Sequence, residues 1–461
     1  MEADLRGVLG RLAARLPEKA VVTDPDIMGR FVHDEAEWAP FGQPAAVVRP
    51  RTTAEVAEAV SACAATGTPL VTRGAGTGLS GGANAVDGCV VLSTELMTGI
   101  RSIDPANQIA VVEPGVINDD LRRAVAGEGL WYPPDPASYQ ISTIGGNVAT
   151  NAGGLCCLKY GVTRDYVLAL EVVLASGAVV RLGSPTKKNS AGYDLRGLMV
   201  GSEGTLGVVT EVTVRLRPLP SGPPITVVGF FDTLTAAGDA VAAVTASGVI
   251  PVALELLDRY CLQAVEDWKR MELDLDAAVL LLARLDTPGA AGEAEAATVL
   301  RCFEAAGASG ALRSDDGETA EALFAARRLA YPALERLGPV LTEDVCVPRT
   351  RVTAMLEAIE AAGARHGVTI ANIAHAGDGN LHPLFVVPAG DDDARRRAQR
   401  AFDDIIAAAI ALGGTVSGEH GIGLLKRAGL ADQVGPDVLA LYAAVKRALD
   451  PAGILNPGKV I

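Results

Sequence analysis

Short apolar runs alternate with amphipathic segments along the first half of the chain, and each change of period predicts a change of element. Apolar runs predict strands at residues 45–50, 69–72, 88–93 and 108–113. A helical period predicts a leading helix within residues 1–45 and further helices at 52–66, with Thr53 near its N-cap, and at 118–128. Residues 145–161 are so dense in glycine that we expect irregular chain there.

The pattern of apolar and polar residues changes after Ser221-Gly-Pro-Pro224, the clearest linker in the sequence. Beyond it, strand-like runs alternate with alanine-rich helical patterns. The expected strands lie at 225–231, 252–257 and 277–285, and the expected helices end near Trp268 and span 292–306. This alternation favours an α+β domain whose helices pack on a sheet. From Ala401 onward the helical pattern dominates, so we divide the chain at residues 1–220, 221–412 and 413–461.

Composition and charge exclude several classes of protein. A chain of 461 residues predicts two or three packed units rather than one core. Its net charge of −15 argues against a nucleic-acid-binding protein, which needs a basic surface. No apolar run approaches the roughly 18 residues of a membrane span, and the charged N-terminus is not typical of a secretion signal. The seven cysteines, an odd number without a C-x-x-C pair, predict reduced thiols. We therefore expect a cytoplasmic enzyme.

A glycine-rich run, Arg73-Gly-Ala-Gly-Thr-Gly-Leu-Ser-Gly-Gly82, follows the strand predicted at 69–72. It contains the G-x-G-x-x-G spacing of NAD-binding proteins, but that motif requires a helix that begins at the glycines. Only residues 83–87 precede the next predicted strand, which is too short for a crossover helix, so the spacing disfavours an NAD enzyme. The remaining interpretations are a loop whose backbone N–H groups hold anionic oxygens, or a simple tight turn.

Three of the five histidines stand in two short C-terminal phrases, His375-Ala-Gly-Asp-Gly-Asn-Leu-His382 and Ser417-Gly-Glu-His-Gly-Ile-Gly423. Turn-forming residues in the first phrase predict a hairpin that places both of its imidazoles near the turn. Two imidazoles and a carboxylate suit a divalent metal ion, and a third imidazole suits a general base. One division of roles makes Glu419 the third ligand and His420 the base. The alternative is that these residues only end strands or occupy a loop.

Several phrases, in order along residues 40–461, resemble a known superfamily. The first four are Val71-Thr-Arg-Gly-Ala-Gly-Thr-Gly78, Pro133-Pro-Asp-Pro136, Ser142-Thr-Ile-Gly-Gly-Asn147 and Gly201-Ser-Glu-Gly-Thr-Leu-Gly207. They resemble the FAD domain of the vanillyl-alcohol-oxidase/p-cresol-methylhydroxylase superfamily. The two histidine phrases and Asn456-Pro-Gly-Lys459 resemble its FAD-linked oxidase branch. That branch includes D-lactate dehydrogenase, the flavin subunit of glycolate oxidase and D-2-hydroxyglutarate dehydrogenase.

The resemblance implies an α+β fold in three parts. A two-subdomain FAD-binding domain of the p-cresol-methylhydroxylase type is expected at 1–220, and an α+β substrate (cap) domain with an antiparallel sheet at 221–412. A helical C-terminal segment at 413–461 is expected to return to the flavin site.

FAD is expected to be bound without a covalent bond, because Thr77 stands where some relatives carry a flavin-tethering histidine. The resemblance implies the following contacts with the cofactor. The pyrophosphate is expected at Arg73, Gly74, Ala75, Gly76, Thr77 and Gly78. The ribityl chain and flavin are expected at Pro134, Asp135, Ser142, Gly145, Gly146 and Asn147. The adenosine half is expected at Glu203, Gly207 and Val209, and Asn456 completes the cofactor-binding set.

The resemblance also implies a metal site of His375, His382 and Glu419, with His420 facing the flavin. Zinc or manganese is expected, although iron also accepts nitrogen and oxygen ligands. A 2-hydroxy acid would bind the ion through its hydroxyl and one carboxylate oxygen, which lowers the pKa of the hydroxyl. His420 would remove that proton while the C2 hydride passes to flavin N5, leaving a 2-oxo acid.

Arg327 matches the family's carboxylate-binding arginine, with Arg328 as the alternative match. In the hydroxyglutarate branch, polar residues hold a second carboxylate. Leu384, Thr342 and Tyr331 occupy the matching places and are not cationic, so we expect a small D-2-hydroxy acid, D-lactate or glycolate. D-2-hydroxyglutarate is the alternative substrate. A non-catalytic FAD-binding subunit of a glycolate oxidase-like complex and the ether-lipid synthase of the same superfamily are disfavoured, because neither accounts for the histidine cluster.

The sequence leaves the partners of the chain partly open. An electron acceptor is required, and oxygen, a quinone, a cytochrome and an electron-transfer flavoprotein all remain alternatives. We expect a protein or quinone acceptor, and a cytoplasmic location with peripheral contact to a membrane through that acceptor as the alternative. A homodimer is also an open alternative, since no residue pattern reports the oligomeric state.

Overall fold

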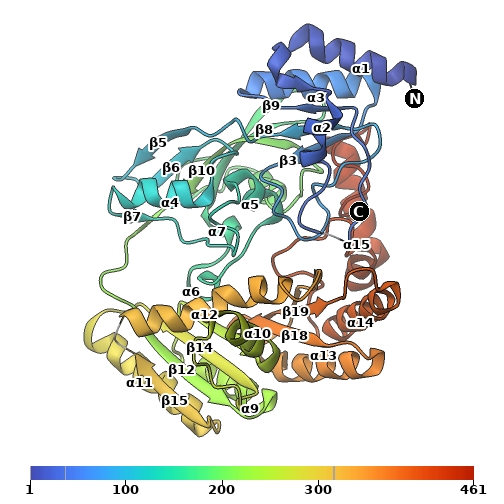
Figure 1. Ribbon diagram of the computed structural model, residues 1–461. Coiled ribbons are helices and arrows are strands. Elements are labelled where there is room, and N and C mark those ends of the chain that lie inside the picture. Colours follow the sequence, from blue (N-terminus) through green and yellow to red (C-terminus); the bar gives the residue numbers. More distant parts are fainter. Residues whose placement is uncertain (1, 37, 315–316) are drawn as a thin grey trace. The chain divides into compact units, whose positions relative to one another are not determined.

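The chain forms two compact units (Figure 1). The computed structural model describes residues 2–36, 38–314 and 317–461. Unit 1 comprises Met1–Gly153, Val162–Leu219 and Glu419–Ile461, and unit 2 comprises Gly154–Gly161 and Pro220–Gly418. Residues 154–161, which we placed in the first part of the chain, therefore lie in unit 2. Lys159 forms an ion pair with Asp286 there, which explains this position.

Unit 1 contains two main sheets and a two-stranded one. The smaller main sheet has the order β1-β2-β4-β3 and consists of β1 (Val21–Val22), β2 (Ala46–Val48), β4 (Val90–Ser93) and β3 (Leu70–Arg73). Strands β2, β4 and β3 are parallel and almost entirely apolar, as expected of strands buried on both faces. The helices beside it are α1 (Glu2–Arg15), α2 (Pro25–Met28) and α3 (Thr53–Thr66). Residues 74–89, all of them described, form no helix, so the spacing argument against a dinucleotide crossover is confirmed.

The larger sheet of unit 1 is antiparallel, with the order β5-β6-β10-β8-β9. Its strands are β5 (Ile100–Asp104), β6 (Ile109–Val112), β10 (Val208–Arg215), β8 (Val167–Val173) and β9 (Val179–Gly183). Around it lie α4 (Asn118–Ala126), α5 (Ile144–Thr150), α7 (Thr163–Tyr166), α8 (Leu195–Met199) and the short pair β7 (Leu130–Trp131) and β11 (Arg217–Pro218). Two main sheets in one unit confirm the two-subdomain expectation for this part of the α+β fold.

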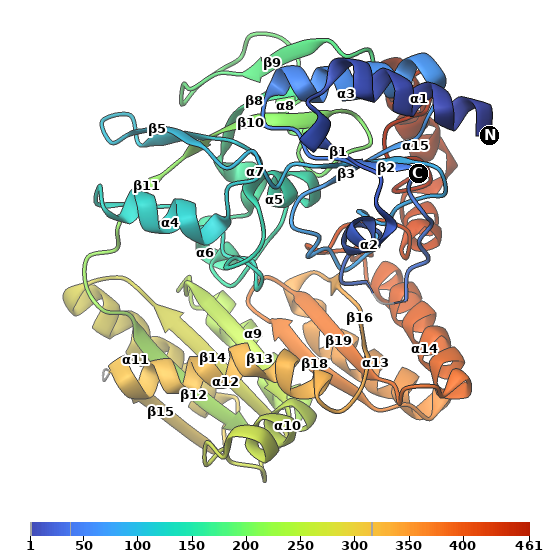
Figure 2. The same cartoon turned by 45° about the horizontal axis from the view of Figure 1, so that its top comes forward.

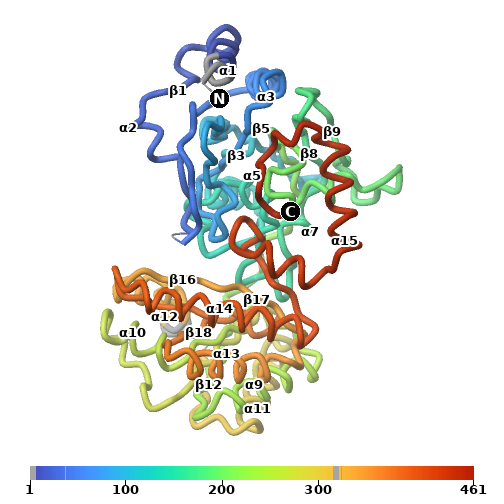
Figure 3. Tube along the Cα trace, turned by 90° about the vertical axis from the view of Figure 1, so that its right-hand side faces the viewer, coloured from blue at the N-terminus to red at the C-terminus, as the bar shows by residue number. Residues whose placement is uncertain are grey.

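The C-terminal segment returns to unit 1 (Figure 3). Helix α15 (Arg427–Leu449) packs Val445 and Leu449 against the core of the antiparallel sheet. The chain then lies beside β3, where the Leu70 N–H donates to Ile454 and the Asn456 N–H donates to Leu70, each at 2.7 Å. The segment around Leu455 thus pairs with the start of β3 and extends the smaller main sheet of unit 1.

The structure corrects two local expectations in part. Residues 145–161 are irregular only at 151–156 and 161, because α5 covers Ile144–Thr150 and α6 covers Cys157–Tyr160. The Thr143 hydroxyl caps α5 by accepting from the Gly146 N–H at 3.2 Å, which outweighs the poor helix propensity of glycine. The cap of α3 is Thr52 rather than Thr53, since the Thr52 hydroxyl accepts from the Glu55 N–H at 3.2 Å.

Unit 2 is built on an eight-stranded antiparallel sheet with the order β15-β12-β14-β13-β18-β19-β16, in which β17 also pairs with β19. The strands are β12 (Ile225–Phe231), β13 (Ala253–Asp258), β14 (Val279–Leu285), β15 (Gly310–Ser314), β16 (Val340–Thr342), β17 (Val345–Cys346), β18 (Ile370–His375) and β19 (Asn380–Val386). The antiparallel sheet expected for the second part of the chain is therefore confirmed.

Helices cover both faces of this sheet (Figure 2). Helices α10 (Arg259–Lys269) and α12 (Gly317–Glu335) share one core with residues of β12, β13, β14, β18 and β19. The other helices are α9 (Leu234–Ala246), α11 (Gly289–Ala305), α13 (Val352–His366) and α14 (Asp392–Ala411). Across the described residues of both units, we find no helix with the length and apolar character needed to cross a lipid bilayer.

Candidate active site

The two histidines of the first phrase lie on a hairpin, as predicted. Strands β18 and β19 pair with His375 opposite Asn380 and Ile373 opposite His382. Because side chains alternate across a strand, both imidazoles lie on one face of the sheet. Their rings meet edge to face at 5.2 Å between centroids, and a ligand nitrogen of one lies within 4.8 Å of a ligand nitrogen of the other.

A buried carboxylate that the sequence analysis missed holds His375. Strand β13 pairs with β18 so that Glu255 lies directly opposite His375, and the Glu255 oxygens lie 2.9 and 3.0 Å from His375 Nδ1. Arg327 Nε on α12 donates to the same carboxylate at 2.7 Å. Burial raises the pKa of Glu255, but the charges of His375 and Arg327 outweigh it and the pKa lies below its ordinary value. An acid in the middle of the apolar run Ala-Leu-Glu-Leu-Leu was the available signal in the sequence.

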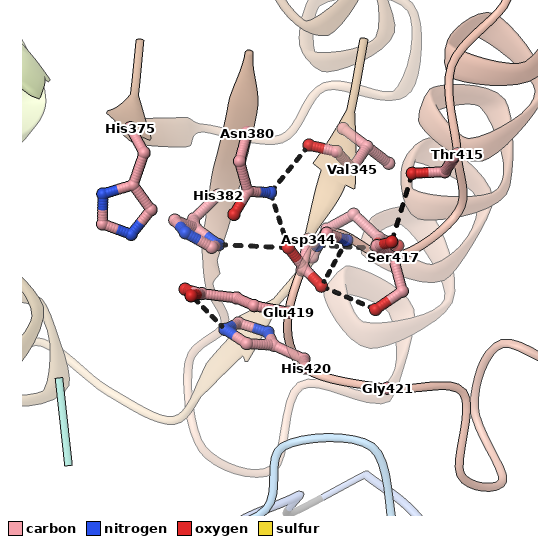
Figure 4. A network of polar contacts seen from close by, with 12 residues as sticks. Asp344, Val345, His375, Asn380, His382, Thr415, Ser417, Glu419, His420 and Gly421 are labelled. Atoms are coloured by element: carbon pink, nitrogen blue, oxygen red, sulfur yellow. Dashed lines mark hydrogen bonds and ion pairs between the residues drawn. The ribbon is translucent and has the colours of Figure 1, made fainter. Parts of the chain in front are cut away.

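A second buried carboxylate stands beside His382 (Figure 4). Asp344 Oδ1 lies 3.7 Å from His382 Nδ1 and accepts a hydrogen bond from the Asn380 side chain at 2.7 Å. Asp344 Oδ2 accepts from the Ser417 hydroxyl at 2.8 Å and from the Gly418 N–H at 3.0 Å. The start of the second histidine phrase is therefore fixed next to Asp344.

Glu419 and His420 follow this anchored point in the chain. Glu419 is the next residue after Gly418, so its backbone lies within one residue of the Asp344 contact. Glu419 Oε1 lies 3.9 Å from His420 Nε2. Within unit 1, the Ser80 hydroxyl donates to the carbonyls of His420 and Gly421, each at 3.0 Å. The Glu-His pair thus lies in a segment that the glycine-rich run helps to position.

The donor atoms of the hairpin fit a divalent metal ion. Each imidazole has a carboxylate near Nδ1, Glu255 for His375 and Asp344 for His382. Histidines that ligate metals usually hydrogen-bond such a partner, which fixes the ring and leaves Nε2 for the ion; Glu255 is within that distance of His375, whereas Asp344, at 3.7 Å from His382, is not. Two imidazoles with an added carboxylate are a donor set that zinc and manganese both accept.

The glycine-rich run of unit 1 packs tightly on the start of α5. A Cβ at Gly74 would meet Thr143 Oγ1 at 2.5 Å, and a Cβ at Gly76, where φ is +81°, would collide with the Arg73 guanidinium. Arg73 Nη1 donates to the His33 carbonyl at 2.6 Å, and burial lowers the pKa of Arg73. The side chain of Arg73 therefore stabilises the loop itself, and contact with a pyrophosphate stays a prediction.

The two phrases expected at the flavin are tied together by a residue that the sequence analysis did not single out. Asn118 Nδ2 donates to Asn147 Oδ1 at 2.9 Å and to the Pro134 carbonyl at 3.2 Å. Asn147 Nδ2 in turn donates to the Ser142 hydroxyl at 3.2 Å. These hydrogen bonds hold residues 133–136 and 142–147 side by side.

Of the remaining predicted cofactor residues, Glu203 and Asn456 lie where the glycine-rich run and the C-terminal segment come together. Glu203, with φ +50°, accepts hydrogen bonds from the N–H groups of Ile422 at 2.7 Å and Gly423 at 2.9 Å. Asn456 Nδ2 donates to the carbonyls of Gly82 at 2.9 Å and Glu203 at 2.7 Å. The glycine-rich run, the Gly201–Gly207 phrase and the C-terminal segment thus converge. Gly207 and Val209 lie beyond them, at the start of β10, where a Cβ at Gly207 would meet Val172.

These loops fit a large polar cofactor. Three buried oxygens in or beside these loops, Thr72 Oγ1 on β3, Asn118 Oδ1 at the start of α4 and Asn456 Oδ1, have no hydrogen-bond partner among the described residues. Buried polar atoms are almost always satisfied in native proteins, so a ligand rich in donors and acceptors suits this place. A dinucleotide meets that requirement.

Gly145 offers a test of how closely this region is packed. A Cβ there would lie 2.5 Å from Pro114 Cβ and 2.9 Å from the Pro114 carbonyl oxygen. We expect Gly145→Ala to lower the free energy of unfolding by about 1–3 kcal/mol and to reduce bound flavin, because the loop must shift. Urea unfolding and flavin absorbance of the purified protein check this. Gly10→Ala is the control, since nothing lies within 4 Å of a Cβ at Gly10 in α1; equal losses would contradict the prediction.

The buried Glu203 predicts a pH dependence. Burial raises its pKa to about 7, so the folded chain holds the proton more tightly than the unfolded chain. The stability that protonation contributes is full below the ordinary pKa and is lost as the pH rises to about 7. We expect urea unfolding between pH 4.5 and 8 to show a smaller decline for Glu203→Gln than for the wild type. Identical pH profiles would contradict the assignment.

Comparison with known proteins covers nearly the whole chain. Residues 44–183 match the model of the FAD binding domain, and residues 225–460 match that of FAD linked oxidases, C-terminal domain. Glycolate oxidase subunit GlcD of Bacillus subtilis (strain 168) is 43% identical over 439 residues, which cover 95% of this chain and 93% of the relative. D-lactate dehydrogenase of Anaerostipes hadrus is 35% identical over 457 residues, or 96% and 95% of the two chains.

The fold also has a close match among solved structures. The crystal structure of p-cresol methylhydroxylase with substrate bound matches with a TM-score of 0.83, covering 100% of this chain and 97% of that chain. The sequence identity is 19%, so this likeness shows a shared fold alone.

Proposed function

Because this chain belongs to the FAD-linked oxidases and is an FAD-dependent oxidoreductase, we propose that it oxidises a small D-2-hydroxy acid, D-lactate or glycolate, to the 2-oxo acid. The observation that carries the proposal is the pair of imidazoles on the hairpin, each with a buried carboxylate near Nδ1. The names of the two relatives, a glycolate oxidase subunit and a D-lactate dehydrogenase, support the same substrate class.

We propose that His375, His382 and Glu419 hold a divalent ion, zinc or manganese. Such an ion, when bound, lowers the pKa of a coordinated hydroxyl, and FAD accepts a hydride at N5. His420 accepts the proton of the substrate hydroxyl through a ring nitrogen. The Ser80 hydroxyl donates to the His420 carbonyl, which fixes the backbone position of the proposed base.

For FAD, we propose non-covalent binding by the loops that converge in unit 1. The glycine-rich run offers backbone N–H groups to the pyrophosphate, which suits an anion. The phrases tied together by Asn118 line the flavin and ribityl chain, and the segment around Glu203 and Asn456 lies at the adenosine half.

We propose that Arg327 binds the substrate carboxylate. Its Nε is engaged by Glu255, and the donors of its terminal nitrogens suit the two oxygens of a carboxylate. Leu384 and Thr342 lie opposite each other on β19 and β16, and Leu384 lies on the same face as His382 because it is two residues further along the strand. Neither residue is cationic, which supports a substrate with one carboxylate rather than two.

Anaerobic bleaching of the flavin by a panel of D- and L-2-hydroxy acids, with and without a metal chelator, tests the proposal. D-lactate or glycolate is expected to bleach the flavin, and the chelator is expected to slow the reaction. If no hydroxy acid reduces the flavin, the function is wrong. If chelation has no effect, the metal role is wrong, and a clearly higher kcat/KM on D-2-hydroxyglutarate would overturn the choice of substrate.

A further inference from the structure

We propose that Glu255 is a positioning residue that couples His375 to Arg327, so that the metal ion and the substrate carboxylate are bound in a fixed relation. The inference rests on the proposed function and extends it to a residue that touches neither the ion nor the substrate. All three side chains belong to unit 2 and come from β13, β18 and α12.

The sheet register places Glu255 between its two partners. Glu255 on β13 is the direct cross-strand neighbour of His375 on β18, and both side chains lie on the face that α12 covers. Oε1 lies 2.9 Å from His375 Nδ1, and Oε2 lies 3.0 Å from the same nitrogen and 2.7 Å from Arg327 Nε. Both oxygens are therefore engaged, and one of them is shared.

The burial of Glu255 indicates that its carboxylate has a functional role beyond packing. Its side chain is 1% exposed in a fully buried strand whose other residues are alanine, leucine and the helix-capping Asp258. A buried carboxylate is costly unless it is paired and hydrogen-bonded, and an apolar residue packs at such positions at lower cost. Balancing the charge of Arg327 alone requires no contact with His375, yet Glu255 contacts both.

The two contacts have separate effects on the proposed site. A carboxylate at Nδ1 fixes the tautomer and the orientation of a metal-binding imidazole and makes Nε2 a better donor. The bond to Nε fixes the plane of the Arg327 guanidinium, whose geometry decides how it meets a carboxylate. Loss of Glu255 should therefore weaken metal binding and substrate binding together.

Asp258 provides a matched control on the same strand. It is also buried and accepts hydrogen bonds from β18, from the Asn372 N–H at 2.6 Å and from Asn372 Nδ2 at 3.0 Å. It accepts from the Cys261 N–H at 3.0 Å and so caps α10. Its hydrogen-bond partners are backbone N–H groups, the Asn372 amide and the Cys261 thiol, so Asp258→Asn disturbs the same part of the sheet without removing the carboxylate at His375.

The test measures Zn²⁺ affinity, which is independent of turnover. The flavin-loaded protein is stripped of metal and titrated with Zn²⁺ against a coloured chelator. We expect Glu255→Gln to weaken binding about 10- to 100-fold and Asp258→Asn to change it less than about threefold. The KM for D-lactate is expected to rise in Glu255→Gln beyond its change in Asp258→Asn. Melting temperatures of both variants report any general loss of stability.

The possible results distinguish failure of the positioning role of Glu255 from failure of the proposed metal site. Unchanged Zn²⁺ affinity in Glu255→Gln, or equal losses in both variants, overturns the positioning role. If the wild type binds no Zn²⁺, the proposed metal site fails first, and this failure is visible without any variant. If Glu255→Gln does not fold, Glu255→Asp keeps the charge beside Arg327 while shortening the reach to His375, and its Zn²⁺ affinity must also fall.

Discussion

Replacing His382 by alanine is expected to abolish metal-dependent turnover, with kcat/KM on D-lactate falling by more than about 100-fold. That figure is the upper end of the cost of losing an outer-shell partner, and loss of a ligand itself should exceed it. The imidazole lies beside His375 on the hairpin and faces Asp344, so alanine removes a donor that no described neighbour on β19 replaces. Bound zinc, measured per flavin, should fall with the activity.

His366→Ala is the control for this experiment. His366 lies at the end of α13 and contacts Asp404 at 2.9 Å, away from the hairpin. Its loss should leave kcat/KM and zinc content within about threefold of the wild type, since surface changes are usually small. Retained zinc and activity in His382→Ala would refute the metal assignment.

Replacing His420 by asparagine is expected to lower kcat by about 10²- to 10⁴-fold, the usual contribution of a general base. The side chain keeps a polar group of similar size but cannot accept a proton at neutral pH. Because Glu419 remains, zinc content should change little. Stopped-flow reduction of the flavin by D-lactate measures the chemical step directly.

The pH profile separates a base from a structural residue. If His420 accepts the proton, the wild-type rate should fall on the acid side of its pH profile, and this acid limb should be absent in His420→Asn. A rate of flavin reduction within tenfold of the wild type, or an unchanged acid limb, would show that another group takes the proton. Ser80→Ala, which removes the hydroxyl that holds the His420 carbonyl, should lower the rate less than His420→Asn.

The hairpin that carries His375 and His382 could be predicted because the residues that determine it are close together in the sequence. Ala-Gly-Asp-Gly-Asn is a turn sequence, and both flanking strands are apolar runs. Strands β12, β13 and β14 were also predicted from their apolar runs, within one or two residues at their ends, whereas β15, β16 and β17 were not predicted. Periodicity reports how a segment contacts a core, and this is enough to locate an element.

The partners of the histidines could not be predicted because they depend on sheet register. Glu255 is 120 residues from His375 in the chain, and only the pairing of β13 with β18 brings them together. Asp344 likewise reaches Asn380 through strand pairing beside β19. No local pattern gives the order of strands in a sheet.

Helix α5 was missed for a different reason. Its glycines have poor helix propensity, so local composition predicts loop. The Thr143 cap and the close approach of Gly145 to Pro114 supply what composition does not show. Tertiary packing determined this element, and packing partners are not visible in a window of sequence.

The contact between β3 and the segment around Leu455 sets an order of events during biosynthesis. The glycine-rich run begins within β3, and Asn456 binds the Gly82 carbonyl at its other end. A ribosome must translate some 370 further codons after that run before its neighbours exist. The nascent chain therefore cannot complete this loop until residue 456 has been made, and the proposed flavin site cannot reach its final form earlier.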